Sequence, residues 1–523
     1  MVFAVSNPTM RQADRRCIDA GTPATTLMYR AGCGIRDAFP FDRHTPVAIF
    51  CGSGNNGGDG FVLALLLAER SIPCTIVLAE EKWSPDGRYY YDKCREQGIP
   101  IQLWQASFSL SGYGVAVDCL FGTGFHGTLP QPYDQMIRQL NSSGLPIVAA
   151  DIPCGLSGDS GKPARTQDGD TLAVRATVTV SIGSCKLGHF LASGKAYCGR
   201  LQNIDIGIPV DPAGCVSVPE AGDFGDILPH RATDSHKGTY GYVAVLGGCR
   251  SYSGAIKLAN LAASSLRCGC GVVKLLCADS ILPSVAPYLL ESTAVPLPDH
   301  GGSLDFAPDA LEKALTGTRA LAVGMGWGDG EHNEAILTWL LQCYPGTLIL
   351  DADGLNCLGR MTEDTRRKLF DERYQAGRTT ILTPHPMEFA RISGVSIAEC
   401  DTDPIPYCKR YAAENHVILL RKGPGTIVTD RHECYIVTRG CAGMATAGSG
   451  DVLSGVLAGL AGYNRGSAKM VACGAYLAGL AGELAQAEMG EIGMVASDTV
   501  RYLATAAKQL QENGECSPTE HSI

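Results

Sequence analysis

Short apolar runs that end in glycine or proline recur along the chain, and segments of helical composition separate several of them. In the first 210 residues these runs are PVAIFCG, CTIVLA, GVAVDCLFG, PIVAADIP and TVTVSI. The second series consists of GYVAVLGG, GVVKLLCAD, ALAVGMGWG, GTLILDADGLN, TTILTPHP and HVILLRKGPGT. Apolar runs of this length are typical of parallel strands buried on both faces. The pattern therefore predicts an α/β protein.

One segment interrupts the alternation of strands and helices. From Ile206 to Pro229 the sequence contains several glycines and prolines and has no hydrophobic period, which predicts a boundary between two domains, 1–214 and 215–523. From Asp451 to about Gln511 the chain is rich in alanine and predicts a helical end to the second domain. The two halves share no obvious sequence, so we expect a fusion and not a duplication.

Composition excludes several classes of protein. The net charge of −10 and the lack of basic runs argue against a nucleic-acid-binding surface. No apolar run reaches the roughly 18 residues of a membrane span, and the first residues do not follow the pattern of a signal peptide. None of the 22 cysteines stands in a CxxC pair, which favours reduced thiols over zinc ligands. We expect a cytoplasmic enzyme with no nucleic-acid or membrane partner.

The loop GSGNNGGDG follows a predicted strand and opens a predicted helix. Its glycines let backbone N–H groups approach a ligand, and the start of a helix favours an anion. Asn55, Asn56 and Asp59 add oxygen atoms that a phosphate cradle does not need, and such oxygens suit a hard cation or a sugar hydroxyl. An Asn- and Asp-rich turn with left-handed residues would also explain them.

Two further aspartates come at the ends of predicted strands. Asp118 precedes the pliable loop LFGTGFHG, and Asp151 precedes PCGLSG. Each could be the cap of a helix or a turn. Because ligands of open α/β sheets bind at the carboxyl ends of the strands, three such loops in one domain favour a shared crevice.

Together, GSGNNGGDG, DCLFGTGFHG and DIPCG resemble the NAD(P)H-hydrate epimerase family, over residues 9–210. The resemblance implies a Rossmann-like three-layer αβα domain that binds the hydrated nicotinamide nucleotides NADHX and NADPHX beside a potassium ion. It places substrate contacts at Asn55, Asn56, Gly57, Gly58, Asp59, Gly122, Thr123, Gly124, Phe125, His126, Gly127, Thr128 and Asp151, and potassium at Asn56, Asp118 and Cys154.

Cys154 departs from the family, which usually has serine there. A neutral thiol is a poor ligand for a hard cation, so we expect weaker potassium dependence or coordination through the backbone carbonyl. Asp151 is the expected acid/base of epimerisation, because a buried carboxylate beside a substrate can be tuned toward neutral pH. Lys186 is either a second polar contact or a solvated surface lysine.

The strongest motif of the second half is GMATAGSGDVLSGVLAGL, from Gly443 to Leu460. A glycine-rich turn leads into a helix whose first turn carries Asp451. Its N–H groups suit a developing phosphate charge, and we expect the helix dipole to lower the pKa of Asp451, so that it accepts a hydroxyl proton. A simple helix start after flexible glycines is the alternative.

Other segments support a nucleotide site. RKGPGT presents Lys422 and Thr426 after a strand, and TPHPMEF holds His385 between two prolines. A lone histidine is often structural, and in DADGLN either Asp351 or Asp353 could face substrate or metal.

This half resembles the NAD(P)H-hydrate dehydratase family, over about residues 225–500. The resemblance implies a ribokinase-like α/β fold in which a nucleotide phosphorylates the ring hydroxyl and loss of phosphate restores the dihydronicotinamide. It implies ADP in preference to ATP as co-substrate, with Mg²⁺. Met387 replaces the family's usual glycine. We therefore expect the backbone at this position to have less conformational freedom than in the family. The implied hydrate contacts are Ala255, Gly326, His385 and Asp451, and the implied nucleotide contacts are Lys422, Gly423, Pro424, Gly425, Thr426 and Gly450.

The two resemblances together imply a repair enzyme, which we expect to be a homo-oligomer. Its first domain interconverts the R and S hydrates, and its second dehydrates the S hydrate with ADP, giving AMP and phosphate. Two alternatives remain. A vitamin or sugar kinase with a nucleotide-sensing domain would accumulate a phosphorylated product. A non-catalytic binding protein would not require Asp451 and its glycine turn.

Overall fold

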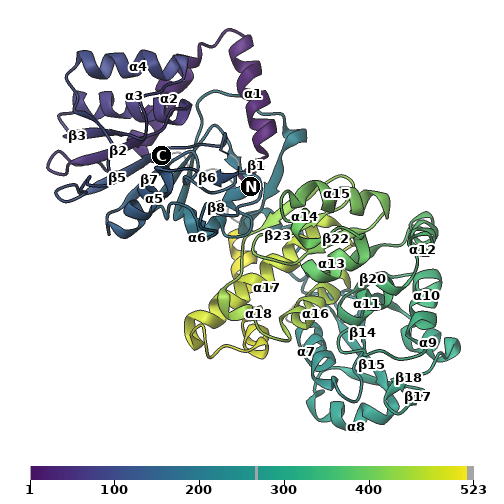
Figure 1. Cartoon of the computed structure of the whole chain (residues 1–523). Coiled ribbons are helices and arrows are strands. Elements are labelled where there is room, and N and C mark those ends of the chain that lie inside the picture. Colours follow the sequence, from purple (N-terminus) through teal and green to yellow (C-terminus); the bar gives the residue numbers. More distant parts are fainter. Residues whose placement is uncertain (1, 126, 265–268, 515–523) are drawn as a thin grey trace. The chain divides into compact units, whose positions relative to one another are not determined.

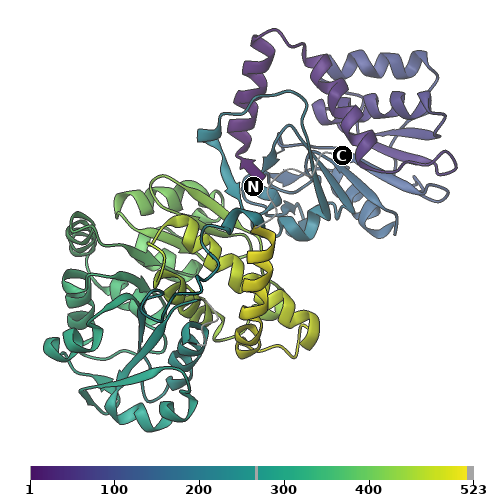
Figure 2. The same cartoon turned by 180° about the vertical axis from the view of Figure 1, so that it is seen from behind.

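A computed structural model describes residues 2–125, 127–264 and 269–514 of the chain. The chain divides into two compact units, Val2–Val216 and Ser217–Ile523, each built around a mainly parallel sheet (Figure 1 and Figure 2). Among the described residues, no helix combines the length and the apolar character that a membrane crossing would need. The described cysteines form no disulfide.

The sheet of the first unit is parallel throughout, and its strands end at one common edge. In spatial order it contains β12 (Arg200–Ile204), β10 (Val178–Ile182), β7 (Ile147–Ala150), β5 (Val115–Cys119), β2 (Val47–Cys51), β3 (Cys74–Leu78) and β4 (Ile101–Leu103). The helices are α1 (Asn7–Asp19), α2 (Ala24–Ala38), α3 (Asn55–Glu69), α4 (Pro85–Glu96), α5 (Tyr133–Ser142) and the short α6 (Gly194–Cys198).

The residues of β2 show why this unit has three layers. Ile49 and Cys51 pack into one core with the apolar side chains of α3, whereas Ala48 and Phe50 pack into a second core with those of α5. Successive side chains of a strand point to opposite faces of a sheet. A strand that is apolar at every position must therefore be covered on both faces. The predicted three-layer α/β/α arrangement is confirmed.

The second unit is also a sheet covered by helices. Its strand order includes β24 (Cys434–Val437), β23 (Thr426–Thr429), β22 (Ile418–Arg421), β21 (Thr380–Leu382), β20 (Thr347–Leu350), β19 (Thr318–Val323), β14 (Tyr242–Leu246), β15 (Val272–Ala278) and β16 (Thr293–Leu297). Neighbours from β22 to β16 are parallel, and β23 is antiparallel to both of its neighbours. The longer helices are α7 (Ser253–Ser264), α9 (Pro308–Leu315), α10 (Asn333–Cys343), α11 (Ala352–Arg360), α12 (Glu363–Gln375), α13 (Pro386–Ser393), α15 (Pro404–Glu414), α16 (Ser449–Ala461), α17 (Ala468–Met489) and α18 (Ala496–Gly514).

Each apolar run predicted to be a strand contains one, and the predicted helical end consists of α16, α17 and α18. The pattern missed β4, β12 and β16, whose residues are mostly polar, partly buried or exposed, and it missed β23 and β24, although most of their residues are buried. The reversal of direction between β22 and β23 was not predicted either, because RKGPGT was not identified as the turn of a hairpin. Edge strands and hairpins escape a pattern that detects buried apolar runs.

Helix α16 is fixed by close contact with α7. A Cβ atom on Gly455 of α16 would lie 2.2 Å from the carbonyl oxygen of Ala259 and 2.8 Å from Cβ of Ala262, both on α7. The glycine thus lets the two backbones approach. This contact sets the position of the first turn of α16, which carries Asp451.

We expect Gly455→Ala to lower the free energy of unfolding by about 1–3 kcal/mol, because the added methyl group overpacks a rigid contact between two helices. Calorimetry of the full chain measures the change. The matched control is Gly254→Ala on α7, where an added Cβ atom meets nothing within 4 Å; it should leave stability unchanged or raise it by up to about 1 kcal/mol. Equal effects of the two substitutions would contradict the packing argument.

Candidate active sites

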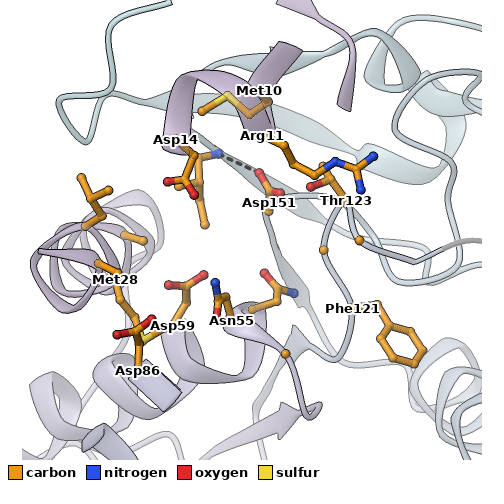
Figure 3. Close-up of a pocket in the computed structure, with 18 of the residues that line it drawn as sticks. Met10, Arg11, Asp14, Met28, Asn55, Asp59, Asp86, Phe121, Thr123 and Asp151 are labelled. Carbon is orange, nitrogen blue, oxygen red and sulfur yellow. Dashed lines mark hydrogen bonds between the residues drawn. The ribbon is translucent and has the colours of Figure 1, made fainter. Parts of the chain in front are cut away.

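A cavity of about 660 Å³ opens at the carboxyl ends of β2, β5 and β7 in the first unit. Figure 3 shows Arg11 and Asp14 entering it from α1, Asn55 and Asp59 from α3, and Asp151 from the end of β7. Predicted site residues that line it are Asn55, Asn56, Asp59, Gly122, Thr123, Gly124, Phe125 and Asp151. The structure thus brings three separate loops to one crevice.

The other predicted residues of this unit lie elsewhere. Gly57 and Gly58 are buried within α3, and Gly127 and Thr128 follow the lining loop into β6 (Thr128–Leu129). Asp118 and Cys154 are fully buried and do not line the cavity. His126 lies outside the described residues.

The glycines of the first loop are required by close approach of backbone segments. A Cβ atom on Gly52 would lie 1.9 Å from the carbonyl oxygen of Leu120, and one on Gly57 would lie 2.0 Å from that of Gly52. Helix α3 begins at Asn55, and its N-cap, Gly54, offers no side chain to the first amides of the helix. The N–H groups of Gly57 and Gly58 donate to the carbonyl oxygen of Gly54, and the start of the helix, at Asn55 and Asn56, favours an anionic ligand.

Buried and partly buried polar side chains face this crevice. The Nδ2 atom of Asn56 is buried without a hydrogen-bond partner in the structure. Burial, and next the charge of Asp151, raise the pKa of Asp59 well above its ordinary value. Burial and then Asp86 raise the pKa of Asp14. A carboxyl group that retains its proton can donate a hydrogen bond as well as accept one, which suits a ligand rich in hydroxyl groups.

Asp151 is the most constrained residue of the cavity. Its φ of +66° lies in the left-handed region, which costs a residue with a Cβ atom roughly 1–2 kcal/mol. Its Oδ1 accepts hydrogen bonds from Nζ of Lys186 and, at 3.2 Å, from the N–H of Ile182. Lys186 is 1% exposed and also donates to the carbonyl oxygen of Ile182 at 2.8 Å. The alternative of a solvated surface lysine is therefore wrong.

The side chain of Asp118 is fully buried and held by two backbone N–H groups. Its two oxygens accept N–H groups of Leu120, at 3.1 Å, and Cys154, at 2.7 Å. Burial raises the pKa of Asp118 to about 7, although both hydrogen bonds oppose the shift. Burial and the charge of Asp118 raise the pKa of the Cys154 thiol. The carbonyl oxygen of Cys154 already accepts the N–H of Val174 at 2.8 Å.

In the second unit a cluster of polar residues forms around the start of α16. Gly448, the N-cap, adopts a left-handed φ of 97°. A Cβ atom on Gly450 would lie 3.1 Å from Nζ of Lys422 and 3.5 Å from Oδ2 of Asp351. Asp351 accepts hydrogen bonds from Nζ of Lys422, at 2.5 Å, and from Oγ of Ser454, at 2.7 Å. The glycine turn, the lysine loop and the end of β20 therefore meet at one point.

The expected pKa shift of Asp451 is wrong in sign. Burial, and then repulsion by Asp351, raise the pKa of Asp451 to about 7, while Lys422 opposes the shift. The partial charge at a helix start is worth at most about 2 kcal/mol, and here burial and a neighbouring carboxylate outweigh it. Asp451 is thus able to gain and lose a proton near neutral pH.

His385 and Glu388 form a capping box at the start of α13. Nδ1 of His385 accepts the N–H groups of Met387 and Glu388, at 3.1 and 3.2 Å, and Oε2 of Glu388 accepts the N–H of His385 at 2.8 Å. Burial and the charge of Lys422 lower the pKa of His385, whereas burial raises the pKa of Glu388 to about 7. Met387 has no positive φ, so its backbone does not need the freedom of a glycine.

The remaining predicted contacts lie in two glycine loops. A Cβ atom on Gly326, whose φ is +62°, would lie 2.9 Å from Cβ of Ala255 and 2.4 Å from the carbonyl oxygen of Tyr252. Gly423, Pro424 and Gly425 form the turn between β22 and β23, and Thr426 is the first residue of β23.

Sequence reasoning left Asp351 and Asp353 as equal candidates and did not single out Ser454, Glu388, Arg11 or Asp14. The structure separates the two aspartates: Asp351 joins Lys422, while Asp353 accepts the N–H of Gly328 at 2.7 Å. Ser454 follows Asp451 by three residues on α16, a spacing that places both on one face of a helix. This spacing could have identified Ser454 as a candidate site residue from the sequence.

Comparisons with known proteins cover both units. A family described as "NAD(P)H-hydrate dehydratase" matches residues 243–505, and one described as "YjeF-related protein N-terminus" matches residues 24–188. The chain is similar to the bifunctional NAD(P)H-hydrate repair enzyme of Coxiella burnetii, with 31% identity over 96% of this chain and 99% of that protein. Identity with the enzyme of the same name from Moorella thermoacetica is 32%, over 98% of each chain.

Among solved structures, the chain is similar to an ADP/ATP-dependent NAD(P)H-hydrate dehydratase from Bacillus subtilis that was co-crystallised with ATP and Mg²⁺. Identity is 26%, the match covers 56% of this chain and 99% of that one, and the TM-score is 0.47.

Proposed function

Because the chain belongs to the family of bifunctional NAD(P)H-hydrate repair enzymes, we propose how its two units divide the repair. The unit Val2–Val216 interconverts the R and S hydrates of NADH and NADPH. The unit Ser217–Ile523 dehydrates the S hydrate with ADP as co-substrate, releasing AMP and phosphate. The observation that carries the second assignment is the position of Asp451 beside Gly450 and the Lys422–Asp351 pair.

Epimerisation requires that a bond at the hydrated ring carbon break and re-form on the opposite face of the ring. A group beside the hydroxyl must give and take a proton during this exchange. We assign this role to Asp151, whose carboxylate lines the cavity and is oriented by Lys186. Asp59 lines the same cavity, and its raised pKa favours the protonated carboxyl group, the form that donates a hydrogen bond.

The chain offers an incomplete set of side-chain ligands for potassium. Asn56 and Asp118 supply oxygen atoms, which hard cations prefer. The Cys154 thiol is a poor ligand because burial raises its pKa and keeps it neutral. We therefore propose that the oxygens of Asn56 and Asp118 hold the ion, where its charge would offset that of the buried Asp118 carboxylate.

Dehydration proceeds through a phosphorylated hydrate in this proposal. The ring hydroxyl oxygen attacks the terminal phosphorus of ADP, the bond from phosphorus to the bridging oxygen breaks, and AMP leaves. Asp451 accepts the hydroxyl proton. The C–O bond of the phosphorylated ring then breaks and phosphate departs with its electron pair, while the neighbouring ring carbon loses a proton and the dihydronicotinamide is restored.

The phosphates of the nucleotide need positive charge and N–H donors. Lys422 and the start of α16 at Gly450 provide both at one point. No group of three or more acidic, cysteine or histidine side chains in the described ranges is arranged to hold a metal by itself. This agrees with Mg²⁺ that enters with the nucleotide, since Mg²⁺ is commonly bound by one or two carboxylates together with substrate phosphates. The ion would neutralise charge on the phosphates.

A mixture of both hydrate epimers of NADH, incubated with the full chain and with ADP, ATP or no nucleotide, tests the proposal. Absorbance of the reduced ring should recover for both epimers, and the recovery should require a nucleotide and be faster with ADP. Asp451→Asn should lower kcat for dehydration of the S hydrate by about 10²- to 10⁴-fold, the usual contribution of a general base. Asp151→Asn should block use of the R hydrate and leave dehydration of the S hydrate intact.

The control is Asp364→Asn, an exposed residue at the start of α12, which should change neither activity. Retained dehydration by Asp451→Asn would contradict the role of Asp451, and unchanged epimer interconversion by Asp151→Asn would remove that of Asp151. A phosphorylated product that accumulates without loss of water would instead indicate a kinase.

The raised pKa of Asp451 predicts the pH dependence of dehydration. A base with a pKa of about 7 is mostly protonated in acid, so kcat/KM for the S hydrate should rise about tenfold per pH unit below 7 and level off above it. Glu388 also has a pKa of about 7, and Glu388→Gln separates the two groups. The fall in kcat/KM below pH 7 should persist in Glu388→Gln. If the fall disappears in that variant, the titrating group is Glu388 and not Asp451.

Cys154→Ser tests the potassium site, because a serine hydroxyl adds the hard oxygen that the thiol does not provide. We expect the KCl concentration for half-maximal epimerase activity to fall several-fold in the variant, with NaCl used to keep ionic strength constant. The KCl-dependent rise in melting temperature of the full chain gives a second measure. Identical potassium responses of wild type and variant would show that position 154 does not contribute.

A further inference from the structure

A buried histidine links the two residues that form the ion pair of the epimerase cavity. His189 lies at the end of a short 3₁₀ turn, Leu187–His189, and is 2% exposed. Its Nδ1 accepts the backbone N–H of Lys186 at 3.2 Å, and its Nε2 lies 3.0 Å from the backbone carbonyl oxygen of Asp151. Because a carbonyl only accepts, the hydrogen-bond network assigns the proton to Nε2.

The imidazole therefore connects two chain segments that are 35 residues apart. One end holds the backbone of Asp151, which is in the left-handed region, and the other holds the backbone of Lys186. The Nζ atom of Lys186 donates to Oδ1 of Asp151 and to the carbonyl oxygen of Ile182. The position of the Asp151 carboxylate thus depends on contacts at both its backbone and its side chain.

His189 is unsuited to be an acid or base itself. It is not among the residues that line the cavity. Burial, and next the neighbouring Lys186 ammonium, lower the pKa of His189 to about 3, against a smaller opposing effect of Asp151. A second proton would also occupy Nδ1, which has to accept the Lys186 N–H. The ring consequently stays neutral in one tautomer throughout the working pH range.

We propose that His189 is a positioning residue of the epimerase, which holds Asp151 and Lys186 in register through one accepted and one donated hydrogen bond. The inference rests on the proposed role of Asp151 and adds to it the device that fixes its geometry. Misplacement of a reacting group by about 1 Å can cost on the order of 100-fold in rate. A modest relaxation at Asp151 would accordingly be measurable in kcat.

Three substitutions separate the two hydrogen bonds. His189→Gln keeps an amide donor near the place of Nε2, and His189→Asn keeps an acceptor near the place of Nδ1. His189→Leu fills the space and makes neither bond. Each is produced in the full chain, so that dehydration of the S hydrate by the second unit reports the amount of intact protein.

The expected result is a loss of kcat for epimerisation of on the order of 10- to 100-fold in His189→Leu, with KM for the R hydrate changed less than threefold. His189→Gln and His189→Asn should each recover part of that loss. The pH profile of kcat should also move in His189→Leu, because Lys186 and Asp151 no longer keep their mutual distance. A residue that only fills space would leave that profile in place, and neither polar variant would restore activity better than leucine.

Unchanged kcat in His189→Leu would overturn the inference. The inference would also fail if kcat, KM and the melting temperature changed together in all three variants, because such a pattern indicates general destabilisation of the protein. Asp151→Asn, measured in parallel, separates this failure from that of the proposed function. If Asp151→Asn blocks epimerisation while His189→Leu does not, Asp151 keeps its role and His189 has none.

Discussion

Each unit depends on a carboxylate that ends a parallel strand and is paired with a lysine. In the first unit Asp151 follows β7 and pairs with Lys186; in the second Asp351 follows β20 and pairs with Lys422. Removing a carboxylate from water costs several kcal/mol unless a partner compensates. Both pairs lie at the carboxyl edge of a sheet, where ligands of α/β proteins bind, and so the same interaction satisfies a buried charge and shapes a site.

A consequence of each pair is a second carboxyl group with an altered pKa. Asp59 lies near Asp151, and Asp451 lies near Asp351; in both cases burial comes first among the causes and the neighbouring carboxylate second. Two carboxylates that share a small space are not easily ionised together. One carboxyl group of each couple therefore holds its proton more strongly than an exposed carboxyl group does, and for Asp451 the pKa is raised to about 7.

Much of this organisation is readable from local sequence. The apolar runs located most of the buried parallel strands of both sheets, and the glycine loops after them located the crevice and the start of α16. The residues that pair with the site aspartates could not be predicted from the sequence. The sequence left Lys186 as either a polar contact or a surface residue, and it gave no reason to single out His189. Both residues contact Asp151 across 35 or more positions of the chain, a distance over which local sequence does not predict contacts.

The sequence by itself determined the α/β class, most of the buried parallel strands and the loops that carry chemistry, since these follow from hydrophobic period and from glycine at points of close approach. Only the tertiary structure decided which charges face one another. It reversed the expected pKa shift of Asp451, paired Asp351 with Lys422 and buried Lys186. The physical reason is that a pKa depends on burial and on neighbours within a few ångströms, and these distances are set by packing between segments that are remote along the chain.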